Sequence, residues 1–425
     1  MAEPQPEAIK TVSPPPRGNG WGQTFHALKY RNFRLLWVTT ILISGGNWVQ
    51  QVTLGWLAFD RTGSPLVVSV VLGLRALPLL MAPMSGVMAD RFNRRKILMA
   101  DQAVLALLAV IFAIDILAGT LEVWHMYAFS FATGVAWSLN NPVRQTLVAN
   151  SVPPDALTNA IAINSMAFHA MRMIGPAVGG SLIVFVGPGI NFLIQAFMYI
   201  AVFASILPYR AEYAQERGPV KQQSPFADLT DGFKYILGDR VIRTTILLTL
   251  VPTFFVMAFT ATQLPAYASV TLGSTSGGAL GVMFTAMGVG GLLGTVMVAR
   301  FSGIRRKGVV VLVTGTGAAV ALIALSFIDS LWLAVLVVVV QQFFFIILMT
   351  TNNTILHTAT PDAMRGRVMG IYMLDIGLQP LGGVIAGVLA TVYSVSTAWF
   401  IGGATGLSIM LTVAMFAKSF RHMRL

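Results

Sequence analysis

Long apolar stretches alternate with short polar segments along the whole 425-residue chain. A helix needs about 20 apolar residues to cross the hydrocarbon core of a bilayer, whereas the helices and strands of soluble cores are shorter. The pattern therefore predicts an all-α membrane protein with twelve transmembrane helices, because the stretches do not alternate as the strands of a membrane β-barrel do. The expected spans are 35–59, 65–89, 97–118, 123–147, 156–184, 189–208, 241–269, 278–299, 308–327, 331–356, 364–391 and 395–417.

A polar stretch at 209–240 separates the sixth span from the seventh and predicts a linker between two six-helix halves, 35–208 and 241–417. The remaining segments are a tail with its lead-in at 1–34 and a short tail at 418–425. Within the linker, apolar residues at helical spacing predict a short helix, which lies either on the membrane surface or in solvent. These apolar residues are Phe226, Leu229, Phe233 and Leu237.

The two halves resemble each other in sequence. The segment "ADRFNRRK" at 89–96 pairs with "VARFSGIRRK" at 298–307, and "GPAVGG" at 175–180 pairs with "GLQPLGG" at 377–383. Duplicated halves that rock about a shared central site are typical of alternating-access transporters. The sequence therefore predicts two pseudo-symmetric halves.

Charge is sparse and strongly biased. Only 10% of residues are charged, and 25 of the 28 Lys and Arg residues fall on the side of the chain termini, whereas Arg61 alone falls on the opposite side. By the positive-inside rule both termini are expected in the cytoplasm and the chain in the cell membrane. Because the cations are dispersed over short loops, no basic face for nucleic acid is predicted.

The loop after the second span concentrates charge in "GVMADRFNRRKIL" at 86–98. Five residues there fit the G-x-x-x-D-R-x-x-R-[RK] signature of the major facilitator superfamily, which the chain resembles over nearly its full length. The resemblance implies the major facilitator fold and a gating loop that latches the halves on the cytoplasmic side; the alternative is positive-inside anchoring alone. The five residues are Gly86, Asp90, Arg91, Arg94 and Arg95.

Two further segments narrow the resemblance. "RMIGPAVGGSL" in span 5 matches the core of the superfamily's antiporter motif, although Ala162 and Met171 stand where that motif has further glycines; the alternative is ordinary small-residue packing. The chain looks most like the enterobactin-exporter and macrolide-efflux group, which implies export of a siderophore-like or drug-like amphiphile. The residues that carry these matches are Gly175, Pro176, Gly179 and Gly180 in span 5, Arg144 in the loop after span 4, Asn159, and Arg365 and Arg367 opening span 11.

Ionisable residues inside a membrane are costly unless paired or hydrated, so they indicate function. We predict that Asp375 pairs with Arg75 or Arg172 and that protonation of Asp375 breaks the pair, with a static ion pair as the alternative. His169 lies one turn before Arg172 and is either a proton carrier or a polar packing residue. The arginine that many proton antiporters carry within span 4 is missing from "MYAFSFATGVAWSLN".

Amide and aromatic side chains in spans 1, 7 and 10 are candidates for the substrate cavity, because the resemblance implies that spans 1, 4, 7 and 10 line it. A wall of this kind suits a large amphiphilic ligand, whereas the alternative role for the amides is hydrogen bonding between helices. The candidates are Asn47, Gln50, Gln51, Phe254, Gln263, Gln341 and Gln342.

No nucleotide-binding loop or metal-ligand spacing occurs in the sequence, so we expect no enzyme activity, cofactor or metal. The sequence predicts a monomeric secondary transporter that exports an amphiphilic small molecule against protons. Uptake or lipid flipping on the same fold, or a receptor that transports nothing, are the alternatives.

Overall fold

The computed structural model describes residues 25–78, 93–209, 225–274, 277–300, 306–372, 374–416 and 420. These residues form helices and contain no strand, so the predicted all-α fold is confirmed. The first bundle consists of α2 (Arg31–Thr62), α3 (Pro65–Ala76), α5 (Arg94–Leu117), α6 (Val123–Ala149) and α7 (Leu157–Ile206). The second consists of α9 (Arg240–Pro252), α10 (Ala258–Ala266), α11 (Gly277–Arg300), α12 (Lys307–Leu325), α13 (Leu331–Ala359), α14 (Asp362–Tyr372), α15 (Leu374–Val392) and α16 (Val395–Phe416).

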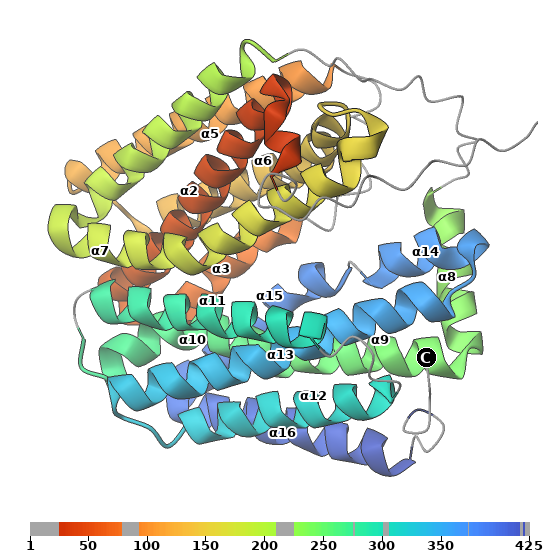
Figure 1. Ribbon diagram of the computed structural model, residues 1–425. Helices are drawn as coiled ribbons and strands as arrows, with labels where there is room; N and C mark the ends of the chain where they lie inside the picture. Colours follow the sequence, from red (N-terminus) through yellow and green to blue (C-terminus); the bar gives the residue numbers. More distant parts are fainter. Residues whose placement is uncertain are drawn as a thin grey trace, which may run out of the picture.

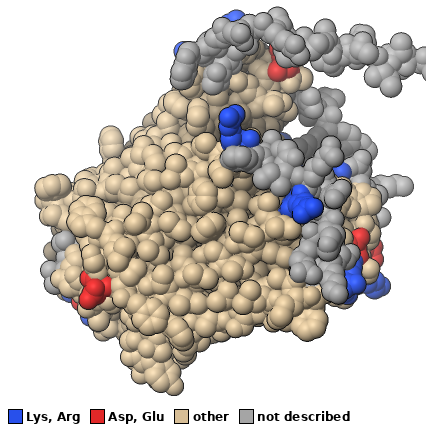
Figure 2. Space-filling model, turned by 60° about the horizontal axis from the view of Figure 1, so that its bottom comes forward, with Lys and Arg blue, Asp and Glu red and all other residues tan. Residues whose placement is uncertain are grey.

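Eight helical stretches among the described residues are long and apolar enough to cross a membrane. The predicted number of twelve is reached only when α7 is counted as two crossings and α2, α3 and α6 are included. Amides interrupt the apolar run of α2, and α3 is described over only 12 residues. Figure 2 shows a broad face without charged side chains between charged edges, as expected for a surface in contact with lipid.

A sharp kink divides α7 into two crossings. Gly187 has φ +79° and ψ 167°, which only glycine adopts without strain. Pro188 follows and fixes φ for the first turn of the next helix. The sequence "VGPG" therefore ends one span and begins another, close to the boundary expected between 184 and 189.

One crossing of the second bundle contains two π-helical turns, η4 (Thr253–Met257) and η5 (Tyr267–Thr271), on either side of α10. Pro252 directly precedes η4, and Pro265 lies two residues before η5. Each proline lacks an N–H and removes one helical hydrogen bond, so the helix widens locally. Such π turns occur frequently at functional sites.

The helix α8 (Pro225–Gly238) packs against α14 beside the second bundle (Figure 1). A Cβ on Gly232 would lie 2.8 Å from Ile371 Cδ1, and Asp231 forms a 3.4 Å ion pair with Arg367. The residues predicted to share an apolar face are partly turned outward, since Phe233 is 48% exposed. The linker helix is thus attached to the start of the crossing that contains α15.

The helix α2 begins, and α16 ends, at the side of the molecule where α8 lies; we call it the terminus side and its opposite the distal side. The two bundles meet along a seam in which α7 packs on α11 and α3 packs on α15 (Figure 1). At the α7–α11 crossing, a Cβ on Gly180 would lie 2.6 Å from Gly281 Cα. On the same seam, one on Gly277 would lie 2.8 Å from Ile183 Cγ2.

The α3–α15 part of the seam is equally close. A Cβ on Gly387 would lie 2.6 Å from Ser69 Oγ, and the Leu66 N–H donates to Thr391 Oγ1 at 3.2 Å. Ser69 Oγ also accepts a 2.7 Å bond from Gln263 Nε2 of the second bundle. These residues occupy the distal halves of their helices, so the described seam is tightly closed at the distal side.

Candidate functional site

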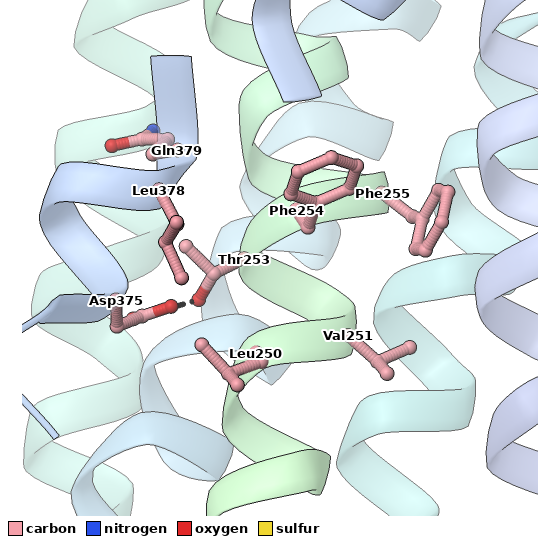
Figure 3. A pocket seen from close by; sticks show the side chains of 8 residues that line it. All are labelled: Leu250, Val251, Thr253, Phe254, Phe255, Asp375, Leu378 and Gln379. Atoms are coloured by element: carbon pink, nitrogen blue, oxygen red, sulfur yellow. Dashed lines mark hydrogen bonds between the residues drawn. The ribbon is translucent and has the colours of Figure 1, made fainter. Parts of the chain in front are cut away.

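A cavity of about 250 Å³ lies between the α9–η4 segment and α15 (Figure 3). The π turn that follows Pro252 contributes three consecutive side chains to its lining, Thr253, Phe254 and Phe255. Its lining is aromatic and aliphatic apart from one carboxyl, one hydroxyl and one amide. The lining residues are Leu250, Val251, Thr253, Phe254, Phe255, Asp375, Leu378 and Gln379.

Asp375 is the charged group of this cavity. Its side chain is 9% exposed and points toward Thr253, whose Oγ1 donates to Asp375 Oδ2 at 3.0 Å (Figure 3). Oδ1 has no hydrogen-bond partner among the described residues. A buried carboxylate with one neutral donor is poorly compensated, so this group is poised to take up a proton or a cationic partner.

The two arginines expected as partners of Asp375 contact other residues in this conformation. Arg75 donates to Asn47 Oδ1, and its guanidinium lies 5.8 Å from the centre of the Trp137 ring. The Arg172 guanidinium lies 5.6 Å from the centre of the Trp48 ring. Among the described residues neither arginine forms an ion pair with Asp375, so the expected pair is not present in this state.

His169 is exposed on α7, and Gln51 is half-buried on α2. The His169 ring meets the ring of Phe168 at 5.6 Å in an edge-on arrangement. No acidic partner of His169 is found among the described residues, so its proton-carrier role stays a prediction.

Most of the amides proposed as cavity walls instead join helices within or between the bundles, the alternative considered from the sequence. Gln50, 1% exposed, accepts from Gln195 Nε2 at 2.7 Å and donates to Thr133 Oγ1 at 3.2 Å. Gln341 donates to Thr260 Oγ1 at 2.7 Å. Gln263 bonds Ser69 across the seam, and Gln342 donates to Met257 Sδ at 3.3 Å. Of the cavity candidates, Phe254 alone is among the residues that line the 250 Å³ cavity.

The signature loop is only partly visible, because Gly86, Asp90 and Arg91 lie outside the described residues. Arg95 Nε donates to the Ile206 carbonyl at 3.2 Å and its Nη2 to the Leu207 carbonyl. A cation at these last carbonyls stabilises the end of α7. Arg94, next to it, lies in the first turn of α5.

The loop position expected for Arg144 is wrong. The helix α6 continues to Ala149, so Arg144 lies inside it, 9% exposed, and donates to Thr40 of α2. The end of α6 is also bonded from outside the helix, since the Tyr209 hydroxyl donates to the Leu147 carbonyl at 3.0 Å. The first bundle therefore does contain a buried arginine in its fourth crossing. Arg365 and Arg367 lie on α14, where Arg367 contacts the linker helix.

The span 5 motif lies at the meeting point of α7 with two other helices. A Cβ on Gly175 would lie 2.7 Å from Trp48 Cβ, and one on Gly179 3.0 Å from Val49 Cα, both of α2. Gly180 contacts α11, and a Cβ on Gly281 would lie 3.0 Å from the Pro176 carbonyl oxygen. The glycines let three backbones approach, as small residues do at membrane helix interfaces.

Asp101 of α5 is a buried acid that was not among the residues predicted from the sequence. It is 6% exposed and accepts from Asn140 Nδ2 at 2.6 Å and Gln102 Nε2 at 2.8 Å. The signal that could have found it is an adjacent acid and amide, "DQ" at 101–102, inside an otherwise apolar predicted span.

Comparison with known proteins agrees with this architecture. Residues 22–423 match the family described as transmembrane secretion effector. The multidrug efflux pump Tap of Mycolicibacterium fortuitum is 25% identical over 409 residues, which cover 92% of this chain and 97% of Tap. The enterobactin exporter EntS of Citrobacter koseri is 24% identical over 362 residues, 84% of this chain and 82% of EntS.

Solved structures show the same fold. A POT family transporter in complex with 5-aminolevulinic acid superposes with a TM-score of 0.75 at 11% identity, covering 92% of this chain and 97% of the transporter. The family match over residues 22–423 and the efflux relatives confirm the superfamily resemblance seen in the sequence. The chain belongs to the transmembrane secretion effector family of major facilitator superfamily transporters and is a transporter, not an enzyme.

Proposed function

We propose that the protein exports an amphiphilic small molecule, siderophore-like or drug-like, in exchange for protons by alternating access. The observation that carries this proposal is the buried Asp375 in an aromatic cavity beside the π turn η4. The family description and the names of Tap and EntS support outward transport.

The seam supports a cycle with two alternating openings. Its described contacts close the distal side, where Gly180 meets Gly281 and Leu66 meets Thr391. The excess of Lys and Arg toward the termini supports a cytoplasmic terminus side, and moving Arg144 into α6 leaves that excess intact. In this orientation the state described here is closed to the outside, as an exporter must be while it loads substrate from the cytoplasm.

Protonation of Asp375 supplies the coupling step. The ionised carboxylate holds Thr253 through a charge-assisted bond and so ties α15 to the π turn. Protonation weakens that tie and removes an uncompensated charge from the membrane interior. When the bundles rock, Arg75 or Arg172 of the first bundle becomes the cationic partner that stabilises the deprotonated form in the opposite state.

The cavity chemistry supports the substrate class. Phe254, Phe255 and Leu378 provide an apolar wall, while Asp375 and Gln379 provide an acceptor and an amide. A ligand with a large apolar body and a few donors matches this lining. A fixed anionic ligand does not, because it would face the Asp375 carboxylate.

The test uses inside-out membrane vesicles and two probes, ethidium and enterobactin. We expect a proton gradient to drive accumulation of at least one probe by the wild type, and Asp375→Asn to lower the gradient-driven part while exchange without a gradient persists. Asp60→Asn is the matched control, because Asp60 is exposed at the distal end of α2.

Unchanged accumulation by Asp375→Asn would refute the coupling role. Probe movement only out of the vesicle lumen, which corresponds to entry into the cell, would favour uptake. Movement of labelled phospholipid alone would favour flipping. Silence toward probes and lipid would favour a receptor.

A further inference from the structure

A second buried carboxylate lies within the first bundle, at the contact between α5 and α6. Asp101, Gln102 and Asn140 are 6%, 0% and 3% exposed. Both amide nitrogens donate to the same oxygen, Asp101 Oδ2, at 2.6 Å from Asn140 and 2.8 Å from Gln102. Oδ1 of Asp101 and Oε1 of Gln102 have no hydrogen-bond partner among the described residues.

Among the described residues, no ion pair or hydrogen bond joins a cation to this carboxylate. On α6, Arg144 lies one turn from Asn140 but donates to Thr40. On α5 itself, Arg95 bonds the carbonyls at the end of α7, and Lys96 is exposed.

A further titratable group nearby is the Tyr199 hydroxyl of α7, which interacts electrostatically with Asp101 and with Arg75. It contacts the amides of Gln195 and Gln50 at 3.1 and 3.4 Å. Tyr199 therefore lies near both the buried acid and the arginine of the neighbouring α3. A neutral hydroxyl in that place supplies no countercharge to Asp101.

Two opposed effects act on the protonation of Asp101. Removal from water without a countercharge favours the neutral acid, whereas two amide donors on one oxygen favour the carboxylate. The balance between these effects depends on hydration, so a change in hydration between transport states would shift it. Asp101 lies seven residues inside α5, roughly 10 Å from its terminus-side end.

A proton fits this site better than a metal ion. Two unpartnered oxygens, one of them a carboxylate oxygen, fall short of the roughly six oxygen ligands that a hard cation needs. Within the described residues no group of three or more His, Cys, Asp or Glu side chains could hold a metal.

We propose that Asp101 is a second proton-binding carboxylate of the transport cycle, so that each bundle binds one coupling proton, Asp101 in the first and Asp375 in the second. This inference rests on the proposed function. Its structural consequence is local: the ionised form ties α5 to α6 through the charge-assisted bond from Asn140, and protonation weakens that tie.

The direct test is infrared difference spectroscopy of the purified full-length protein in lipid nanodiscs, between mildly acidic and mildly alkaline buffer. The wild type should show carboxyl bands that Asp101→Asn and Asp375→Asn each remove in part. A titrating signal that Asp101→Asn leaves unchanged would overturn the proposal. This measurement needs no substrate, so it separates failure of this inference from failure of the proposed function.

The second test measures how far export proceeds at a fixed gradient, with the membrane potential clamped to zero and ethidium or enterobactin as the probe. With a difference of one pH unit across the membrane, exchange for two protons supports a limiting ratio of probe concentrations on the two sides of about 100-fold, and exchange for one proton a ratio of about tenfold. Asp101→Asn should lower the ratio to about tenfold, and Asp101→Asn/Asn140→Asp, which moves the acid across the same contact, should restore it. An equal ratio for wild type and Asp101→Asn, with both folded by size-exclusion chromatography, would show a structural acid only and refute the coupling role.

Discussion

Adding one methyl group to the seam should shift the equilibrium between the two transport states. A Cβ on Gly281 would lie 2.8 Å from Gly180 Cα and 3.0 Å from the Pro176 carbonyl oxygen. Carbon atoms pack at about 3.5–4.0 Å, so Gly281→Ala requires α7 and α11 to separate by roughly 1 Å. Overpacking of this kind costs about 1–3 kcal/mol. The methyl group destabilises only the state in which the distal side is closed, because the helices separate there in the other state.

The expected shift in the ratio of distal-open to distal-closed protein is about 5- to 140-fold, since 1.4 kcal/mol changes a ratio tenfold. The assay is the labelling rate of Ser69→Cys by a membrane-impermeant maleimide applied from the distal side. Ser69 is 0% exposed in the closed seam, and the chain contains no cysteine of its own. The rate therefore reports the open fraction.

The matched control is Gly291→Ala on the same helix. Its Cβ would lie 3.4 Å from Ile346 Cγ1 of the same bundle, so the methyl does not enter the seam. We expect Gly291→Ala to label at the parental rate and Gly281→Ala to label faster by the factor above. Equal rates for the two folded variants would refute the assignment of this crossing as the distal gate.

Four further substitutions test the buried bonds and the linker contact. Ser69→Ala should destabilise the closed seam by about 1–3 kcal/mol, because it deprives the Gln263 amide of its partner across the seam. Gln263→Leu should cost less, since it also removes the unpartnered Gln263 oxygen. Thermal unfolding in detergent compares the stabilities of the two variants. Gln195→Leu should lower the free energy of unfolding by about 1–2 kcal/mol through loss of the bonds to Gln50 and the Gly46 carbonyl, and an unchanged unfolding midpoint would contradict this. Asp231→Asn should lower the free energy of unfolding by at most about 1 kcal/mol, and only at low salt, because the Asp231 carboxylate is 51% exposed. A salt-independent effect on the unfolding midpoint would be inconsistent with a solvated ion pair.

The fold was predictable because the length of an apolar run is a local property. The sequence also indicates the kink at Gly187, because glycine can end one helix and the proline that follows it can begin the next. The glycine stripe of span 5 was predicted as a packing motif for a similar reason. Which helices it brings together depends on the fold and appears only in the contacts with Trp48 and Gly281.

The side chains of the site were harder to assign, because a polar residue on a membrane helix can face the cavity or a neighbouring helix. Gln50 and Gln341 are amides of the kind expected in a cavity wall, yet each forms a hydrogen bond with a residue of a neighbouring helix that lies far away in the sequence. Arg144 and Asp101 both lie near the ends of their predicted spans, where an ionisable residue is easily taken for a loop residue. Their partners, Thr40 and Asn140, are what keep them inside the helices.

The linker helix α8 packs on α14 and is therefore mechanically coupled to the second bundle. Because Gly232 contacts Ile371 directly, α8 cannot move away from the second bundle without disturbing the helix that leads into α15 and Asp375. In the proposed orientation, a cytoplasmic molecule that binds α8, or a chemical modification of α8, would act from outside the membrane on the crossing that contains Asp375. Such control of transport would act through a surface that lies apart from the Asp375 cavity.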